Sequence, residues 1–519
     1  MNATIDGGFW AERRRLNREV LLPDGERRLR EAGTFDNLRA AASGSGEYRG
    51  LIYQDSDLHK WVEALGWELR NAPSAALQRM ADEVTALLTA AQADDGYLDT
   101  AIQVPGRERY RNLADEHEVY CMGHLIEAGL AHPPLLPVAR RAADHLVARF
   151  GERWGVCGHP EAELALVGLY RATGERAYLS LARAFIDRRG HRRLPERFGG
   201  STYLVDRVPV REQTRVEGHA VRQLYLNCGA TDVYLETGER ALLDALLAQW
   251  DDMVEGKTYI TGGVGSDASQ EAFGEPWDLD PETAYAETCA AIASFLWSWR
   301  LLRATGETRF ADLMERTLYN GVLVGVAPDR SEYAYANTLH GTTRRRPWFD
   351  CACCPPNVMR LLASLHRYLA TDDERGLTLH HYATGKPADG VRVQTDYPWA
   401  GRVHVHAERP VRLRVPAWST AARLDGRPVG PGYVDAGPGE ITLDLDVSPR
   451  ITRPDPRIEA VRGCVALERG PLVYCEEEAE LVPYAFNRGV APIRVWLPQS
   501  ASLQNAWEAS SPSTASAPR

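Results

Sequence analysis

The sequence repeats one pattern three times: Leu169-Tyr170-Arg171-Ala172-Thr173-Gly174-Glu175, Val233-Tyr234-Leu235-Glu236-Thr237-Gly238-Glu239 and Leu301-Leu302-Arg303-Ala304-Thr305-Gly306-Glu307. The three threonines, at positions 173, 237 and 305, lie 64 and 68 residues apart. Apolar residues at helical spacing flank each repeat, and a glycine directly after a helix is typical of a helix C-terminus. Each repeat therefore predicts two helices joined by a tight turn, and the nearly constant period predicts a helical-repeat architecture.

Further hairpins are expected around residues 71–74 and 132–134, which lack the Thr-Gly-Glu motif. A helix near residues 8–31 can pair with a helix that follows Asn357, which gives about six hairpins in residues 1–375. Such hairpins close into an (α/α)6 barrel or stay open as a solenoid. The number of helices favours the closed barrel.

Long connections separate the hairpins, in contrast to the short turns within them; they are residues 93–116, 191–218, 254–286 and 327–356. Loops of this length in a compact domain are usually functional. Because the tight turns share one end of the hairpins, the long loops must share the other. We expect the binding pocket at that long-loop end.

After about residue 376 the sequence alternates between apolar and polar residues, as in Val403-His404-Val405-His406 and Val411-Arg412-Leu413-Arg414-Val415. This alternation, with Gly and Pro between the segments, predicts short strands. The expected architecture is a multidomain α plus β protein: an (α/α)6 barrel over residues 1–375, then a β-sandwich over residues 376–508. The Ser/Ala/Pro-rich residues 509–519 are expected to be a disordered tail.

Composition restricts the class of protein. The chain has 519 residues, 44% of them hydrophobic and 25% charged, with a net charge of −11. An acidic chain without a long basic block is a poor nucleic-acid binder, so a small neutral substrate is the expected partner. The N-terminus lacks an apolar stretch, which predicts a cytoplasmic protein without a membrane span. A homodimer is left open.

Three of the nine cysteines lie within four residues, in Cys351-Ala352-Cys353-Cys354-Pro355-Pro356-Asn357. Isolated cysteines such as Cys228 and Cys464 are read as packing residues. Clustered thiols favour zinc over redox chemistry or simple packing. A fourth ligand is expected from Glu287-Thr288-Cys289. Glu287, Cys289 and two of the clustered thiols would form a site with three sulfurs and one oxygen.

For Glu287 and Cys289 to reach one ion, the helix after them must start at or after Thr288, since residues i and i+2 point apart on a helix. Thr288 is a good N-cap residue, which would leave Glu287 and Cys289 in an extended or cap conformation. Zinc keeps its thiolates deprotonated but also reduces their nucleophilicity. From the residue types alone, a structural zinc is therefore favoured over a catalytic one.

Other candidate side chains lie at the same long-loop end. His117, His159 and His219 each precede an apolar helical run at equivalent positions of successive hairpins, and neutral imidazoles suit a polyhydroxylated ligand. Glu271 precedes the apolar pair Ala272-Phe273, which would raise its pKa to suit a general acid; an ordinary solvated loop carboxylate is the favoured alternative. His404 and His406 share one strand face and are expected to be ordinary surface residues.

Several motifs together resemble glycoside hydrolase family 127, the β-L-arabinofuranosidase type. They are Asp57-Leu58-His59-Lys60-Trp61, His117-Glu118-Val119-Tyr120, Cys157-Gly158-His159, Gly262-Gly263-Val264-Gly265-Ser266, Tyr285-Ala286-Glu287-Thr288-Cys289, Pro347-Trp348-Phe349-Asp350 with the cysteine cluster, and Arg469-Gly470-Pro471-Leu472-Val473-Tyr474. The cysteine cluster with an upstream Glu-Thr-Cys is highly specific, and the resemblance covers most of the chain.

The resemblance implies an (α/α)6 barrel with β-sandwich material and a retaining mechanism with Cys353 as nucleophile. It implies Zn2+ as cofactor and moves the zinc from a structural to a catalytic role. The implied zinc ligands are Glu287, Cys289, Cys353 and Cys354. Glu271 takes the acid/base role, and the implied sugar-binding residues are His117, His159, His219 and Tyr335. Cys351 has no assigned role.

Two departures from the family pattern bear on these expectations. After the first sandwich the chain is shorter than typical members of the family, so a second β-domain is expected to be partial or missing. Residues 332–339 differ from the usual aromatic-Val-Asn-Pro pattern, which leaves Tyr335 and the sugar specificity open.

The expected function is an exo-glycosidase that releases β-L-arabinofuranose from oligosaccharides or glycoconjugates. The alternatives are an exo-glycosidase for another pentose or a branched acidic sugar, a non-catalytic helical-repeat sugar-binding protein with a structural zinc, and a redox-sensing thiol protein.

Overall fold

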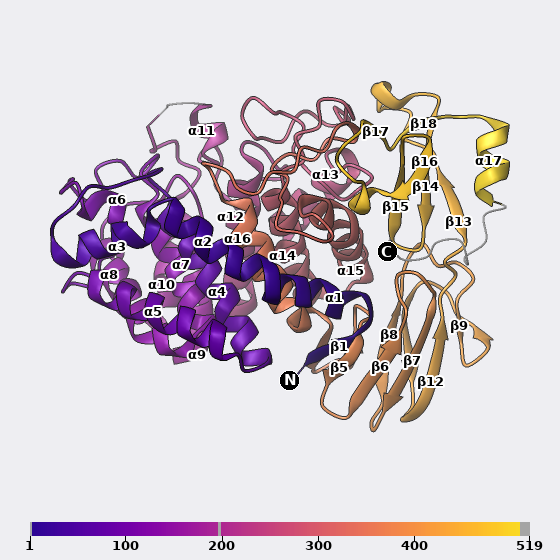
Figure 1. Ribbon diagram of the computed structural model, residues 1–519, viewed down its shortest axis with the longest axis horizontal. Helices are drawn as coiled ribbons and strands as arrows, with labels where there is room; N and C mark the ends of the chain where they lie inside the picture. The colour runs from indigo at the N-terminus through magenta and orange to yellow at the C-terminus, as the bar shows by residue number, and fades with distance from the viewer. Residues whose placement is uncertain (1–2, 196–198, 509–519) are drawn as a thin grey trace.

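The computed structural model describes residues 3–195 and 199–508. It has a helical N-terminal region and β-sheet domains toward the C-terminus, which lie side by side (Figure 1). The predicted tail 509–519 lies outside the described residues. Among the described residues, no helix combines the length and apolar character that a membrane crossing would need.

Six helices carry mostly buried side chains and form an inner set. The inner helices are α4 (Asp55–Asn71), α7 (Glu118–Ala131), α9 (Ala162–Thr173), α12 (Ala220–Thr237), α14 (Thr288–Thr305) and α16 (Cys354–Ser364). Each packs against the next in this order, and α16 packs against α4. The inner helices thus surround a common axis.

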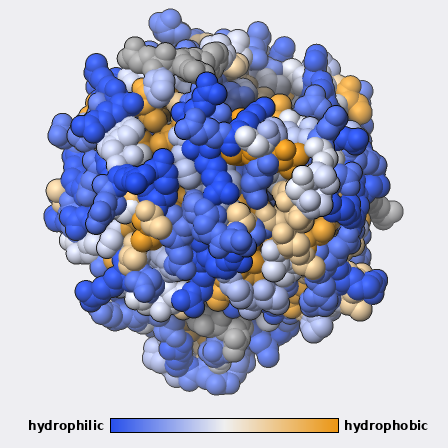
Figure 2. All heavy atoms as spheres, turned by 90° about the vertical axis from the view of Figure 1, so that its left-hand side faces the viewer, coloured by the Kyte–Doolittle hydropathy of each residue, from blue (hydrophilic) through white to orange (hydrophobic). Residues whose placement is uncertain are grey.

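The remaining helices bury one face only and pack outside this set. They are α1 (Gly8–Leu16), α2 (Leu22–Glu31), α3 (Thr34–Ser43), α5 (Ala75–Ala91), α8 (Leu136–Phe150), α10 (Arg176–Arg188), α13 (Arg240–Gly256) and α15 (Thr308–Arg316). Short helices α6 (Thr100–Gln103) and α11 (Gly200–Tyr203) lie in the long loops, and α17 (Ala501–Glu508) ends the described chain. The side of the molecule shown in Figure 2 is mostly hydrophilic, with small apolar patches between polar ones.

The three Thr-Gly-Glu turns are helical hairpins, as predicted. Gly174, Gly238 and Gly306 follow α9, α12 and α14 with φ of 76°, 68° and 77°. This left-handed conformation is easy for glycine and ends the helix by redirecting the chain. The expected helix over residues 8–31 is divided by a π-helical turn at Asn17–Leu21. The helix expected after Asn357 begins earlier, at Cys354.

The β region contains three sheets, and apart from β1 and β2 their strands begin at Ala370, a few residues before the expected boundary. The first sheet contains β1 (Thr4–Gly7), β5 (Thr384–Ala388), β6 (Val391–Thr395), β7 (Arg402–Ala407), β12 (Gly439–Asp444), β9 (Arg423–Leu424) and β10 (Arg427–Pro428). The second contains β11 (Gly432–Ala436), β8 (Val411–Val415), β4 (Gly376–Leu379) and β3 (Ala370–Asp373). Along β7, exposed and buried residues alternate, as the sequence predicts.

The third sheet follows from residue 449. It contains β13 (Pro449–Thr452), β14 (Cys464–Arg469), β15 (Leu472–Glu477), β17 (Ile493–Arg494) and β2 (His340–Gly341), with β16 (Glu480–Pro483) and β18 (Leu497–Pro498) at its sides. Two strands in these sheets come from the N-terminal part of the chain: β1 pairs with β5, and β2 pairs with β17. The β domains are therefore joined to the helical region at both places.

Candidate active site

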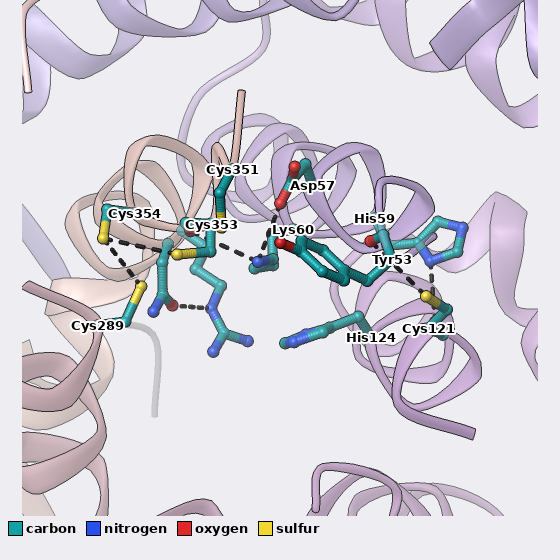
Figure 3. Close-up of polar contacts among 12 residues, drawn as sticks. Tyr53, Asp57, His59, Lys60, Cys121, His124, Cys289, Cys351, Cys353 and Cys354 are labelled. Carbon is teal, nitrogen blue, oxygen red and sulfur yellow. Dashed lines mark hydrogen bonds and ion pairs between the residues drawn. The ribbon is translucent and has the colours of Figure 1, made fainter. Parts of the chain in front are cut away.

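The structure brings four metal-ligand side chains together at the N-termini of α14 and α16. The ligand atoms of Glu287, Cys289, Cys353 and Cys354 all lie within 4.8 Å of one another. Cys289 Sγ lies 3.3 Å from Cys354 Sγ, and Cys353 Sγ lies 3.7 Å from Cys354 Sγ (Figure 3). Oε1 of Glu287 lies 3.7 Å and 3.9 Å from the sulfurs of Cys353 and Cys354.

These distances fit a tetrahedral zinc site. With Zn–S bonds of about 2.3 Å, two sulfurs at the corners of a tetrahedron are about 3.8 Å apart, and a sulfur and an oxygen are about 3.5 Å apart. The observed separations of 3.3–3.9 Å bracket these values. Thiolates with one carboxylate are also the donor set that zinc prefers over magnesium or calcium.

The start of α14 explains how neighbouring residues reach one point. The helix begins at Thr288, as the spacing requires, but Glu287 is the N-cap, with an extended backbone, and Thr288 is the first helical residue. Cys289 therefore lies in the first helical turn, not in an extended segment as expected. Because Glu287 precedes the helix, its carboxylate can turn toward the thiol of Cys289. The hydroxyl of Thr288 instead donates to the carbonyl of Ala334, at 2.8 Å.

Cys351, the first thiol of the cluster, lies outside the four-ligand group. Its sulfur is 3.8 Å from the hydroxyl of Tyr335. Figure 3 shows Cys351 apart from Cys289 and Cys354, with Cys353 between them. Among the three clustered thiols, the structure thus brings Cys353 and Cys354 together with Glu287.

Burial and neighbouring acidic groups change the pKa of Glu287 and of Cys289 in opposite directions. Burial, and then the charge of Cys353, raises the pKa of Glu287 well above its ordinary value. Burial alone would also raise the pKa of Cys289, but hydrogen bonds with Cys353 and Cys354 outweigh burial and lower it to about 6. A divalent cation would offset this repulsion and favour the ionised form of every ligand.

Glu271 lies beside this group, on the long loop before α14. Its Oε2 is 3.0 Å from Nε2 of His219, and the hydroxyl of Tyr335 donates to its Oε1 at 3.5 Å. The carboxylates of Glu271 and Glu287 and the imidazole of His219 have ligand atoms within 4.8 Å of one another. Backbone hydrogen bonds from Ala220 to Glu271 and from Phe273 to Gly218 fasten the loop to the start of α12.

The expected raised pKa of Glu271 is wrong. Burial does raise the pKa of this carboxyl, but the hydrogen bond and charge of His219 lower it by more, and the pKa lies below its ordinary value. The apolar neighbours Ala272 and Phe273 are adjacent in sequence, whereas His219 approaches only in the folded chain. Glu271 is therefore a carboxylate in the free protein, which accepts a hydrogen bond from His219.

The three predicted histidines form a row. The ring centroids of His117 and His159 are 5.8 Å apart, and those of His159 and His219 are 5.9 Å apart. His117 and His219 are the N-caps of α7 and α12. His159 is not in the equivalent position, since Glu161 caps α9. Burial lowers the pKa of all three imidazoles, that of His117 to about 3, so each is neutral at neutral pH.

Two cations near this site were not singled out from the sequence. Lys60, on α4, is buried; its ammonium lies 3.3 Å from Oδ1 of Asp57 and donates to the carbonyl of Cys353 at 3.5 Å (Figure 3). Arg222, three residues after His219, is 6% exposed. Its Nε and Nη1 have no hydrogen-bond partner among the described residues. The sequence contains both residues beside quoted motifs, but a single Lys or Arg on a helix gives no sign of burial.

The chain matches a known family of enzymes. The family model for β-L-arabinofuranosidase, GH127 catalytic domain, matches residues 2–367. The protein is therefore a glycoside hydrolase. A second model, for the glycoside hydrolase family 127 C-terminal domain, matches residues 449–486, within the third sheet. Within its class, the chain belongs to glycoside hydrolase family 127.

Individual proteins of this family are similar to the chain over most of its length. The chain is 34% identical to a non-reducing end β-L-arabinofuranosidase of Bifidobacterium longum subsp. longum, over 92% of this chain and 87% of that one. It is similar to the crystal structure of a GH127 β-L-arabinofuranosidase from Geobacillus stearothermophilus T6, with 31% identity, a TM-score of 0.91, and 96% and 100% of the two chains covered. A second GH127 β-arabinofuranosidase structure gives 30% identity and a TM-score of 0.89, with 96% and 97% covered.

Proposed function

We propose that the protein is a retaining exo-glycosidase that releases β-L-arabinofuranose from the non-reducing ends of oligosaccharides or glycoconjugates, with Cys353 as nucleophile. The observation that carries the proposal is the proximity of three groups. Cys353, at the N-terminus of α16, lies 3.7 Å from Glu287, and Glu287 lies within 4.8 Å of Glu271. A nucleophile and a proton donor thus face the same space. The names of the relatives favour arabinofuranose as the sugar.

The architecture of the helical region supports this reading. Six inner helices, each in contact with the next and the last with the first, together with their outer partners fit an (α/α)6 barrel. The candidate residues of the site lie at or before the N-termini of inner helices, where the long loops enter. We take this end of the barrel as the substrate pocket.

The implied cofactor is zinc, held by Glu287, Cys289, Cys353 and Cys354. When bound, zinc would keep the cysteine sulfurs in the thiolate form at neutral pH. Cys353 is the N-cap residue of α16. Its side chain is also only partly buried, whereas those of Cys289 and Cys354 are fully buried. Cys353 is thus the thiolate that a substrate can reach.

The reaction then takes two steps. The sulfur of Cys353 attacks the anomeric carbon while Glu271, protonated in the enzyme–substrate complex, donates its proton to the departing glycosidic oxygen. The aglycone leaves as an alcohol, and the sugar is held by a C–S bond. Glu271, now a carboxylate, takes a proton from water, whose oxygen attacks the same carbon and expels the thiolate. Two inversions give a product with retained configuration.

The side chains around the proposed reacting groups can form hydrogen bonds with a sugar. His117, His159 and His219 are neutral, so each imidazole can donate one hydrogen bond and accept another. Tyr335 shares its hydroxyl between Glu271 and Cys351, which places it at the edge of the reacting groups. The unpartnered N–H groups of Arg222 face no protein acceptor and can donate to hydroxyl groups of the sugar.

The proposal is tested with a panel of p-nitrophenyl pentosides. We expect hydrolysis of the β-L-arabinofuranoside, with the anomeric configuration of the first-formed product followed by proton NMR. Glu271→Gln should lose activity on substrates with poor leaving groups by a factor of about 10²–10⁴. Hydrolysis of pyranosides alone would contradict the specificity, and a first-formed product of inverted configuration would contradict the mechanism.

A further inference from the structure

A second cavity lies at the other end of the helical region, away from the candidate active site. Its volume is about 800 Å³, within the range of small-molecule sites. It is lined by residues from the C-terminal halves of all six inner helices, among them Trp67 of α4 and Arg303 of α14. Cys289 and Arg303 are separated by 14 residues of α14, or about 21 Å along the helix axis. Ala3, Thr4 and Pro387, from the first sheet and its edge, form one wall.

The lining of this cavity is rich in arginine. It contains six arginines, Arg70, Arg171, Arg300, Arg303, Arg360 and Arg367, and only three carboxylates, Glu63, Glu127 and Asp232. The chain as a whole is acidic, with a net charge of −11. The overall charge of the protein therefore does not account for the six arginines in this cavity.

Only three of these six arginines form ion pairs with carboxylates of the lining. Arg360 is 2.9 Å from Glu63, and Asp232 pairs with Arg171 at 2.7 Å and with Arg300 at 2.5 Å. The other three are Arg70, Arg303 and Arg367. In residues 3–195 and 199–508, no carboxylate lies within 4.0 Å of any of them. They are also exposed at the cavity mouth.

Two of these three arginines lie over one aromatic ring, and the third lies near another arginine. The guanidinium groups of Arg70 and Arg367 lie 5.1 Å and 4.1 Å from the ring of the same residue, Trp67. Burial and then the charge of Arg171 lower the pKa of Arg303. The charge of Arg171 thus opposes that of Arg303, and a bound anion would offset this repulsion. Arginine is also the side chain best shaped to bind carboxylate or phosphate in two hydrogen bonds.

The deeper part of the cavity has the chemistry of a sugar site. Trp299 lines it, and its indole ring offers an apolar face on which a sugar ring can pack, whereas the ring of Trp67 is covered by Arg70 and Arg367. Glu127 lines it too, and among the described residues no side chain or backbone group hydrogen-bonds its carboxyl. Burial, and then the charge of Glu63, raises its pKa to about 7. It can therefore either accept or donate a hydrogen bond at neutral pH, as hydroxyl groups require.

We propose that this cavity binds a small anionic carbohydrate, with its carboxylate or phosphate group at Arg70, Arg303 and Arg367 and its ring near Trp299 and Glu127. The site is separate from the proposed catalytic pocket. Its occupation does not depend on the identity of the hydrolysed sugar.

The test is isothermal titration calorimetry on the full chain with four probes: glucose 6-phosphate, glucuronate, neutral glucose and inorganic phosphate. We expect saturable binding of at least one of the two anionic sugars, at least about 10-fold tighter than that of glucose or inorganic phosphate. Arg303→Gln and Arg367→Gln should each weaken it about 10-fold, the effect of losing one hydrogen bond to a charged group.

The matched control is Arg240→Gln, since Arg240 is an exposed arginine on the outer helix α13 that pairs with Asp244. It should bind the anionic sugar as the wild type does. Melting temperatures of the three variants show whether each is folded, and hydrolysis of an aryl arabinofuranoside should persist in all of them. Absence of saturable binding for both anionic sugars would overturn the proposal, as would unchanged binding in both cavity variants. Equal affinity for inorganic phosphate would overturn the assignment to a carbohydrate.

Discussion

Nε2 of His219 lies 3.0 Å from Oε2 of Glu271, so that the N-cap imidazole of α12 holds the loop carboxylate proposed as the acid/base. Replacement of His219 by Ala should lower kcat/KM by about 10²-fold, since Glu271 loses its orientation. The hydrogen bond lowers the pKa of Glu271, so its loss should raise that pKa. A general acid works in its protonated form, and the alkaline limb of the pH–rate profile should therefore move to higher pH.

The pH–rate profiles of wild type and His219→Ala check this expectation. His406→Ala, on the exposed face of β7, is the control and should match the wild type. An alkaline limb that stays in place, or moves to lower pH, would contradict the proposed role of His219.

Neighbouring thiols of the cluster should differ in their effect on activity. Cys353→Ser should lose at least about 10⁴-fold in kcat, because the nucleophile is removed. Cys351→Ser should stay within about 10-fold of the wild type, since Cys351 is not one of the four ligand residues, although its thiol contacts Tyr335 and Cys353. Steady-state kinetics on one aryl arabinofuranoside measures both. The reverse order of effects would assign the nucleophile to Cys351.

Metal removal should abolish the activity and lower the stability of the folded protein. Glu287, Cys289 and Cys354 are buried with their acidic groups together, and without a cation they repel. Dialysis against a chelator should lower the melting temperature, and zinc, but not magnesium, should restore it. Metal analysis should find one zinc per chain. Normal hydrolysis by protein with no measurable metal would contradict the role of the site.

Loss of a single partner from the buried Lys60–Asp57 pair should be costly. The side chains are 1% and 4% exposed. Lys60→Met leaves Asp57 as an uncompensated buried charge and should lower the free energy of unfolding by about 3–5 kcal/mol. The double variant Lys60→Met/Asp57→Asn should recover part of this loss. Arg392→Gln, which removes an exposed pair with Asp6, should leave the melting temperature unchanged. Equal stability of the wild type and Lys60→Met would refute the expectation.

Stability toward acid should depend on His117. Burial lowers the pKa of His117 from 6.5 to about 3 in the folded chain. Between these values the unfolded chain binds a proton that the folded chain does not, so stability is present above pH 6.5 and is lost as the pH falls toward 3. The contribution of this one group is on the order of 5 kcal/mol at most. His117→Gln should flatten the fall in melting temperature between pH 6.5 and 4, and an unaltered slope would show that this group is not responsible.

Local signals in the sequence were sufficient for the helical hairpins. A glycine such as Gly238 ends a helix by its own conformation, so its effect is visible without the rest of the chain. The pairing of β1 with β5 could not be predicted in this way. Thr4 lies opposite Lys386, and a register between residues so far apart depends on the packed helices between them.

The sequence predicted the part of the site that depends on residue type alone, the candidate metal ligands. Clustered cysteines with Glu287 and Cys289 indicate a metal whatever the surrounding fold, and the structure brings four of them together. The pKa of Glu271 was predicted in the wrong direction because its lowering comes from His219, 52 residues away in sequence. Lys60 was overlooked because burial of a lysine depends on its partner, Asp57, and on the helices that cover both.

The most direct test of the central claim is the location of the covalent intermediate. In Glu271→Gln, a p-nitrophenyl β-L-arabinofuranoside has a leaving group that needs no acid, while the second step lacks its base and slows. Rapid quenching and peptide mass spectrometry should then find one pentosyl group, attached to Cys353 on the peptide that contains residues 351–354. A pentosyl group on any other residue, or none during steady turnover, would contradict the assignment of Cys353 as the nucleophile.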